Sequence, residues 1–194
     1  MKYVKDFAEF KIYEMTDEEF NPIWEPLVVK MFDETSLVYD WRDLLQDHEK
    51  QKLKALRERT KERATVNLVA HLNGELVGWS KGVQETHEQF FVMNSAVFEA
   101  FRRKGVYTEL IRTINEKAME LGFQRIHSTH MISNNAVIIA KLKQGFRITG
   151  FECSDYMGML VHLTYFSNPK RNEILDFRAG WVKPTDEIRK LFRL

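Results

Sequence analysis

The chain has 194 residues, of which 44 % are hydrophobic and 29 % charged, as in an ordinary soluble globular domain. Its 29 Lys and Arg residues nearly balance 28 Asp and Glu, whereas nucleic-acid-binding proteins carry a basic excess, so we expect no nucleic-acid partner. The single cysteine, Cys153, excludes an internal disulfide and a multi-cysteine zinc site. No apolar run approaches the roughly 20 residues that span a bilayer, and no secretory h-region follows Met1. We therefore expect a cytoplasmic protein without membrane association or metal.

Residues 1–63 read as mostly helical. Thr16-Asp17-Glu18-Glu19 has the form of a capping box, in which a hydroxyl and a carboxylate satisfy each other's backbone N–H groups at a helix start. Pro22 and Pro26 then predict a kink or two short helices, because proline removes a hydrogen bond from the helix interior. From residue 41 to 59, leucines among dense charges predict an amphipathic helix.

The pattern changes to that of strands over residues 64–98. Apolar residues alternate along 65–72, Asn73-Gly74 follows, and a second apolar run begins at Glu75. Asn-Gly between two such runs is typical of a type I′ hairpin. A third strand is predicted over Phe90–Val97.

A basic turn with one glycine follows this third strand and leads directly into a helix. Arg102, Arg103 and Lys104 precede Gly105, and the helix opens within the same turn. Such a turn offers successive backbone N–H groups and the positive end of a helix dipole to an anion. A short basic run is more often a solvated turn, but its place between strand and helix favours a site for a pyrophosphate.

The rest of the chain alternates between helices and strands. We predict a helix over 107–121 closed by Gly122, a strand over 125–132, a helix begun by Asn134 or Asn135 and closed at Gly145, strands near 147–152 and 157–166 with a turn at 153–156, and a short terminal helix opened at Thr185. This order favours a mixed α/β (α+β) fold, with helices packed on a sheet.

This order and two motifs resemble the GCN5-related N-acetyltransferase (GNAT) superfamily. Arg102, Gly105 and Tyr107 occupy the places of its Arg/Gln-x-x-Gly-x-Gly/Ala motif, and a second signature is echoed from Asn134 to Gly145-Phe146. The resemblance covers roughly residues 64–166. It implies a central mixed, mostly antiparallel sheet with helices on both faces and a splay between its fourth and fifth strands. Those two strands are the one that ends at Val97 and the one over 127–131.

The resemblance also implies a division of the chain. A GNAT-like domain spans residues 1–166, with an acceptor-side region over 1–63 and an acetyl-CoA-binding core over 64–166. Residues 167–194 form a C-terminal extension, which docks either on a second subunit of a homodimer or on its own sheet.

Acetyl-CoA is the implied co-substrate. Backbone amides of the turn bind its pyrophosphate, the strand before the turn pairs with the pantetheine arm, and the thioester lies in the splay. The matching positions are Ser95, Ala96, Val97, Arg102, Arg103, Lys104, Gly105, Val106, Tyr107, Thr108, Asn134 and Lys141.

Two of these residues depart from the family pattern. Tyr107 stands where the family has a small residue that allows close backbone approach. Lys141 stands where the family usually has a tyrosine, thought to protonate the departing thiolate. Lys141 is either a proton donor or charge partner with a lowered pKa, or a solvent-facing lysine without a role, and we favour the second.

An amine with a pKa of about 10 must lose a proton before it attacks a thioester. Glu85, Asn94 acting through a water, His127 and His130 are all possible bases by position, and the sequence singles out none of them. His127 and His130 are three residues apart on a strand, which places them on opposite faces and argues against a joint metal site.

The acceptor is expected to be a primary amine of a small molecule or a protein. Asp33, Glu34 and Asp40 lie in the segment that borders the acceptor site in this family, and they favour a cationic amine. Two other readings stay open: a non-catalytic acyl-CoA-binding module and a nucleotide-phosphate-binding regulatory domain.

Overall fold

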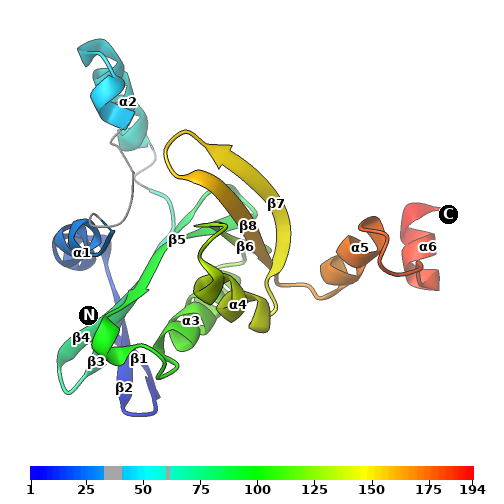
Figure 1. The fold of residues 1–194 in the computed structure, drawn as a ribbon, viewed down its shortest axis with the longest axis horizontal. Coiled ribbons are helices and arrows are strands. Elements are labelled where there is room, and N and C mark those ends of the chain that lie inside the picture. Colours follow the sequence, from blue (N-terminus) through cyan, green and yellow to red (C-terminus); the bar gives the residue numbers. More distant parts are fainter. Residues whose placement is uncertain (33–40, 60–61) are drawn as a thin grey trace.

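A computed structural model describes residues 1–32, 41–59 and 62–194 (Figure 1). Its eight strands form one sheet in the order β1-β2-β3-β4-β5-β6-β8-β7, antiparallel except for the β5–β6 pair. The strands are β1 (Lys2–Phe7), β2 (Phe10–Met15), β3 (Thr65–Leu72), β4 (Glu75–Gln84), β5 (Gln89–Val97), β6 (Arg125–Met131), β7 (Arg147–Ser154) and β8 (Gly158–Phe166). The predicted mixed, mostly antiparallel sheet is confirmed.

Six α-helices accompany the sheet in the described part of the chain. They are α1 (Asp17–Phe32), α2 (Asp47–Arg59), α3 (Val106–Glu120), α4 (Asn135–Lys143), α5 (Lys170–Arg178) and α6 (Asp186–Phe192). Within these residues, no helix combines the length and the apolar character that crossing a membrane requires.

The prediction that residues 1–63 are mostly helical is wrong for the first fifteen residues. These form the β1–β2 hairpin, which extends the sheet by pairing β2 with β3. Phe10 and Ile12 are buried while Lys11 between them is exposed, which is the alternation of a half-buried strand. Three residues of alternation among charged neighbours were too short a signal to recognise.

The prolines predicted either a kink or two short helices, and the second alternative is wrong, because α1 runs as one helix through Pro22 and Pro26. The capping box at its start is confirmed, because Thr16 and Glu19 each accept a hydrogen bond from the other's backbone N–H. Phe20 is buried and Trp24 packs beside it against the sheet. This packing holds the helix continuous despite the hydrogen bonds that the prolines remove.

The predicted amphipathic helix over 41–59 starts later than expected. Residues 41–44 form a 3₁₀ turn, and α2 begins at Asp47 with no buried residue. Asp33, Glu34 and Asp40, expected to border the acceptor, lie outside the described residues.

The two faces of the sheet carry separate apolar cores. Leu68 and Ala70 of β3 face helix α3 in the larger core, whereas Val69 between them faces α1 in the smaller one. Their alternation, and the Asn73-Gly74 turn with both residues at positive φ, confirm the predicted hairpin. Helices therefore cover both faces, as predicted.

Strands β5 and β6 separate along their length. They are the two strands, the fourth and fifth of the GNAT-like sheet, between which the resemblance implies a splay. They pair only from Gln89↔Arg125 to Phe91↔His127, and beyond this point no pairing joins them. The register of β5 against β4 shifts between Lys81 and Gly82, so Met93 forms a bulge just after the last β5–β6 pair.

The C-terminal helices α5 and α6 stand away from the sheet (Figure 1). Arg171 on α5 pairs with Glu88 at 3.1 Å, and Asp176 pairs with Arg147 of β7. Thr185 caps α6 as predicted. Helix α5 was not predicted.

Candidate acetyl-CoA and acceptor site

The turn between β5 and α3 has two residues in the left-handed region of backbone conformation. Arg103 has φ 63° and Gly105 has φ 83°. The hydrogen bonding of α3 begins where Glu109 N–H donates to the Gly105 carbonyl at 3.0 Å, so the N–H groups before it belong to the open end of the helix. Left-handed residues within such a turn gather N–H groups into an anion-binding concavity. The chain is thus shaped locally as an anion cradle.

Gly105 is required here for two reasons. First, its φ of 83° is unfavourable for any residue that carries a side chain. Second, a Cβ added at this position would lie 2.9 Å from the ring of Phe7. Phe7 ends strand β1, so the N-terminal hairpin packs directly against the cradle.

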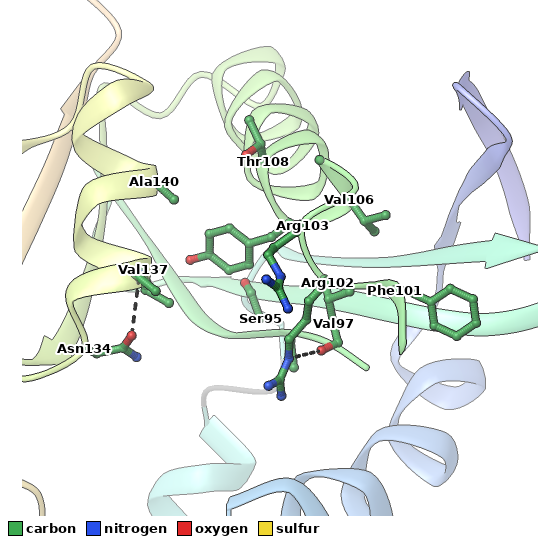
Figure 2. A pocket seen from close by; sticks show the side chains of 14 residues that line it. Ser95, Val97, Phe101, Arg102, Arg103, Val106, Thr108, Asn134, Val137 and Ala140 are labelled. Carbon is green, nitrogen blue, oxygen red and sulfur yellow. Dashed lines mark hydrogen bonds between the residues drawn. The ribbon is translucent and has the colours of Figure 1, made fainter. Parts of the chain in front are cut away.

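A cavity of about 570 Å³ opens beside this turn, between β5, the start of α3 and helix α4 (Figure 2). Ten of the twelve predicted cofactor residues line it: Ser95, Ala96, Val97, Arg102, Arg103, Gly105, Val106, Tyr107, Thr108 and Asn134. Phe101, Ala136, Val137 and Ala140 complete the lining and had not been singled out. Figure 2 shows Val137 and Ala140 of α4 across the cavity from Arg102 and Arg103.

The three cations of the turn are used differently. Arg102 donates from Nε to the Val97 carbonyl at 3.2 Å, which fixes the turn against the end of β5. Arg103 lines the cavity. Lys104 does not line the cavity, because its Nζ lies 3.7 Å from Glu9 in the β1–β2 turn.

Asn134 caps helix α4 as predicted, accepting a hydrogen bond from Val137 N–H at 3.3 Å. Its side-chain amide nitrogen remains a donor for a ligand. Tyr107 packs partly against the larger core, and burial raises the pKa of its hydroxyl, which therefore stays protonated.

Lys141 is fully buried, so the favoured expectation of a solvent-facing lysine is wrong. Its ammonium donates to the Ser128 hydroxyl at 2.7 Å and lies 4.6 Å from the centre of the Phe146 ring. The Ser128 hydroxyl in turn is 3.0 Å from Nε2 of His130. Lys141 is seven residues after Asn134 and shares its side of α4, but it does not line the cavity.

Burial dominates the proton affinities of this group. It lowers the pKa of Lys141 to about 7. Burial, together with the charge of Lys141, lowers the pKa of His130 to about 3. His130 is therefore neutral at physiological pH and can accept a hydrogen bond from Ser128.

The other possible bases lie on the opposite face of the sheet. His127 and Glu85 form a hydrogen bond of 2.7 Å between Nε2 and a carboxylate oxygen. The side-chain oxygen of Asn94 accepts from the indole N–H groups of Trp79 at 2.7 Å and Trp24 at 3.4 Å. Asn94 is thus committed to holding α1 on the sheet.

Besides the four lining residues named above, sequence reasoning missed two residues that support the site, Phe7 and Ser128. The sequence around each of them does not reveal its role, because each contacts a site residue in another element. Phe7 lies against Gly105, and Ser128 accepts the hydrogen bond from Lys141.

A family model described as "Acetyltransferase (GNAT) family" matches residues 12–146, more than half of the chain. A comparison with curated proteins gave no match.

Solved structures resemble the fold. A GNAT family acetyltransferase from Elizabethkingia anophelis with acetyl-CoA bound is 18% identical, with a TM-score of 0.59 over 82% of this chain and 99% of the other. The ribosomal-protein-S18-alanine N-acetyltransferase from Escherichia coli is 14% identical, with a TM-score of 0.56 over 81% of this chain and 93% of the other. Nourseothricin acetyltransferase is 20% identical, with a TM-score of 0.50 over 54% of this chain and 66% of the other.

Proposed function

The chain belongs to the acetyltransferase (GNAT) family, and we propose that it transfers an acetyl group from acetyl-CoA to a primary amine by direct attack in a ternary complex. The observation that carries this proposal is the joining of the anion cradle, the end of β5 and the apolar side of α4 in one cavity. Those three surfaces suit a ligand with a pyrophosphate at one end and a long, largely uncharged arm.

The residues present fit such a ligand. The N–H groups at the start of α3 and the guanidinium of Arg103 would hold the pyrophosphate, because both favour negative charge. Ser95 to Val97 and Asn134 offer polar groups along the path of the arm, and Val137 and Ala140 offer apolar contact. The thioester would then lie where β5 and β6 part.

The class of acceptor is a primary amine, on a small molecule or on a protein. Both kinds of acceptor appear in the names of structural neighbours, one being an acetyltransferase of nourseothricin and another of a ribosomal-protein alanine. Acceptor recognition is assigned to the face that carries α1, opposite the cavity.

Two measurements test the proposal. CoA should raise the midpoint temperature of thermal unfolding, and ATP should raise it far less, because only CoA has a pantetheine arm to occupy the part of the cavity between β5 and α4. Release of thiol from acetyl-CoA should then require a primary amine, measured with a panel of amines. Binding of CoA with no amine-dependent release would instead indicate an acyl-CoA-binding module, and equal shifts with CoA and ATP a phosphate-binding domain.

A further inference from the structure

His127 lies at the point where β5 and β6 separate, on the face opposite the cavity. It is paired with Phe91, the last residue of β5 that pairs with β6, and the two rings are 5.0 Å apart. Phe90 and Val92, the neighbours of Phe91, point into the larger core beneath α3. Because side chains alternate along a strand, Phe91 and His127 face the side of the sheet that carries α1.

Glu85 fixes the orientation of this imidazole. Its carboxylate lies 2.7 Å from Nε2, and an ionised carboxylate only accepts hydrogen bonds, so Nε2 carries the hydrogen. Nδ1 is then the basic nitrogen. The His127 side chain is 13 % exposed, while Glu85 remains open to solvent.

The charges around His127 act in opposite directions. Burial lowers the pKa of the imidazole, Arg125 on β6 and His162 on β8 lower it further, and Glu85 raises it, with a net lowering. His127 is therefore neutral at physiological pH, as a group that accepts a proton must be.

We propose that His127, oriented by Glu85, is the base that accepts the proton of the acceptor amine. This inference rests on the proposed function, which places the thioester where the two strands part. An ammonium group R–NH₃⁺ arriving on the α1 face would give one proton to Nδ1, and the proton would pass to solvent. The freed electron pair on nitrogen then forms a C–N bond to the carbonyl carbon of acetyl-CoA, and the C–S bond breaks. The nitrogen loses a second proton, which protonates the sulfur of the departing CoA, so the products are the amide and the CoA thiol.

The chain provides a matched control pair. His162 on β8 bonds to Glu152 on β7 at 2.8 Å, with the same atoms as the His127–Glu85 pair. This second pair lies on a strand that does not border the separation of β5 and β6. His162→Gln removes an imidazole with an equivalent carboxylate partner from β8, which carries none of the groups proposed to react, and it also removes the lowering effect of His162 on the pKa of His127.

The first readout needs no substrate. Titration of the imidazole nitrogens of the full chain by NMR should show neutral His127 with hydrogen on Nε2 and a pKa below the ordinary value. Glu85→Gln should lower this pKa further, because it removes the carboxylate that favours the charged ring. Hydrogen on Nδ1, or a pKa that does not fall in Glu85→Gln, would overturn the inference.

The second readout is the pH dependence of kcat/KM for a primary amine. His127→Gln should lose about 100-fold or more near pH 7, the usual contribution of a general base. The loss should shrink as pH rises toward the amine pKa of about 10, because the amine then deprotonates without help. His162→Gln should lose far less activity than His127→Gln, because it leaves the His127–Glu85 pair in place, and both variants should keep the wild-type affinity for CoA.

The two proposals fail in different ways. If His127→Gln kept full activity and its kcat/KM fell at low pH as in the wild type, the role of His127 would be overturned and acetyl transfer would stand. No transfer by the wild-type chain to any primary amine would overturn acetyl transfer, and the role of His127 with it.

Discussion

The ammonium group of Lys141 on α4 donates a 2.7 Å hydrogen bond to the hydroxyl of Ser128 on β6, within the protein interior. The family usually has a tyrosine at this position, and lysine differs from it by carrying a charge when protonated. Burial makes that charge costly, so the protonation of Lys141 is coupled to the stability of the fold.

This coupling predicts a pH dependence of stability with a definite sign. The pKa of Lys141 is about 7 in the folded chain and about 10.4 when unfolded, so between these values the unfolded chain holds the extra proton. The free energy of unfolding should therefore rise with pH from about 7 toward 10. Lys141→Met should be more stable than the wild type at pH 7 and should lose this rise, measured by urea unfolding at several pH values. A wild-type slope that persists in the variant would show that Lys141 is not its source.

Arg103 and Lys104 are adjacent cations with different surroundings, which gives a test of the cradle. Arg103 lines the cavity, whereas Lys104 lies beside Glu9. Arg103→Ala should weaken CoA binding by about 1.5–3 kcal/mol, the range for a hydrogen bond to a charged group. Lys104→Ala should change it much less. Isothermal titration with CoA measures both, and an equal loss in the two variants would mean that only the overall charge of the turn matters.

Gly105 and Gly122 are a matched pair for testing the contact with Phe7. Both have positive φ, but a Cβ at Gly122 meets nothing within 4 Å, whereas one at Gly105 meets the Phe7 ring at 2.9 Å. Gly122→Ala should cost about 1–2 kcal/mol for the left-handed backbone alone. Gly105→Ala should cost more, and the excess should disappear in a Phe7→Ala background. Equal costs at both glycines in urea unfolding would argue against the close approach of the hairpin.

The C-terminal extension should be dispensable for binding. All residues that line the cavity lie between Ser95 and Ala140, whereas α5 is tied to the rest of the chain by two half-buried ion pairs, neither of which involves a residue of the cavity. A chain of residues 1–166 should fold and bind CoA with wild-type affinity, as judged by circular dichroism and titration. Failure to fold would place the extension inside the domain.

The cradle could be predicted from the sequence because its geometry is local. A strand end, a basic turn with Gly105 and a helix start are consecutive, so the pattern of residues 97–108 determines it. The caps at Thr16, Asn134 and Thr185 were predictable for the same reason.

The surroundings of Lys141 and His127 could not be predicted because they depend on contacts across the sheet. The sequence of α4 does not say that position 141 faces Ser128, and the sequence of β6 does not say that Glu85 reaches His127. The β1–β2 hairpin was missed because its pairing with β3 spans more than fifty residues, and local pattern carries little of that information.

Acetyl transfer to a primary amine is tested most directly by comparing two amines that carry the same charge but differ in whether their nitrogen can form an amide. The rate of thiol release from acetyl-CoA should be measured near pH 7 with a primary amine and with its N,N-dimethyl analogue. We expect release with the primary amine alone, because a tertiary amine has no second proton to lose and cannot form the stable amide. Equal release with both amines, or with neither although CoA binds, would contradict it.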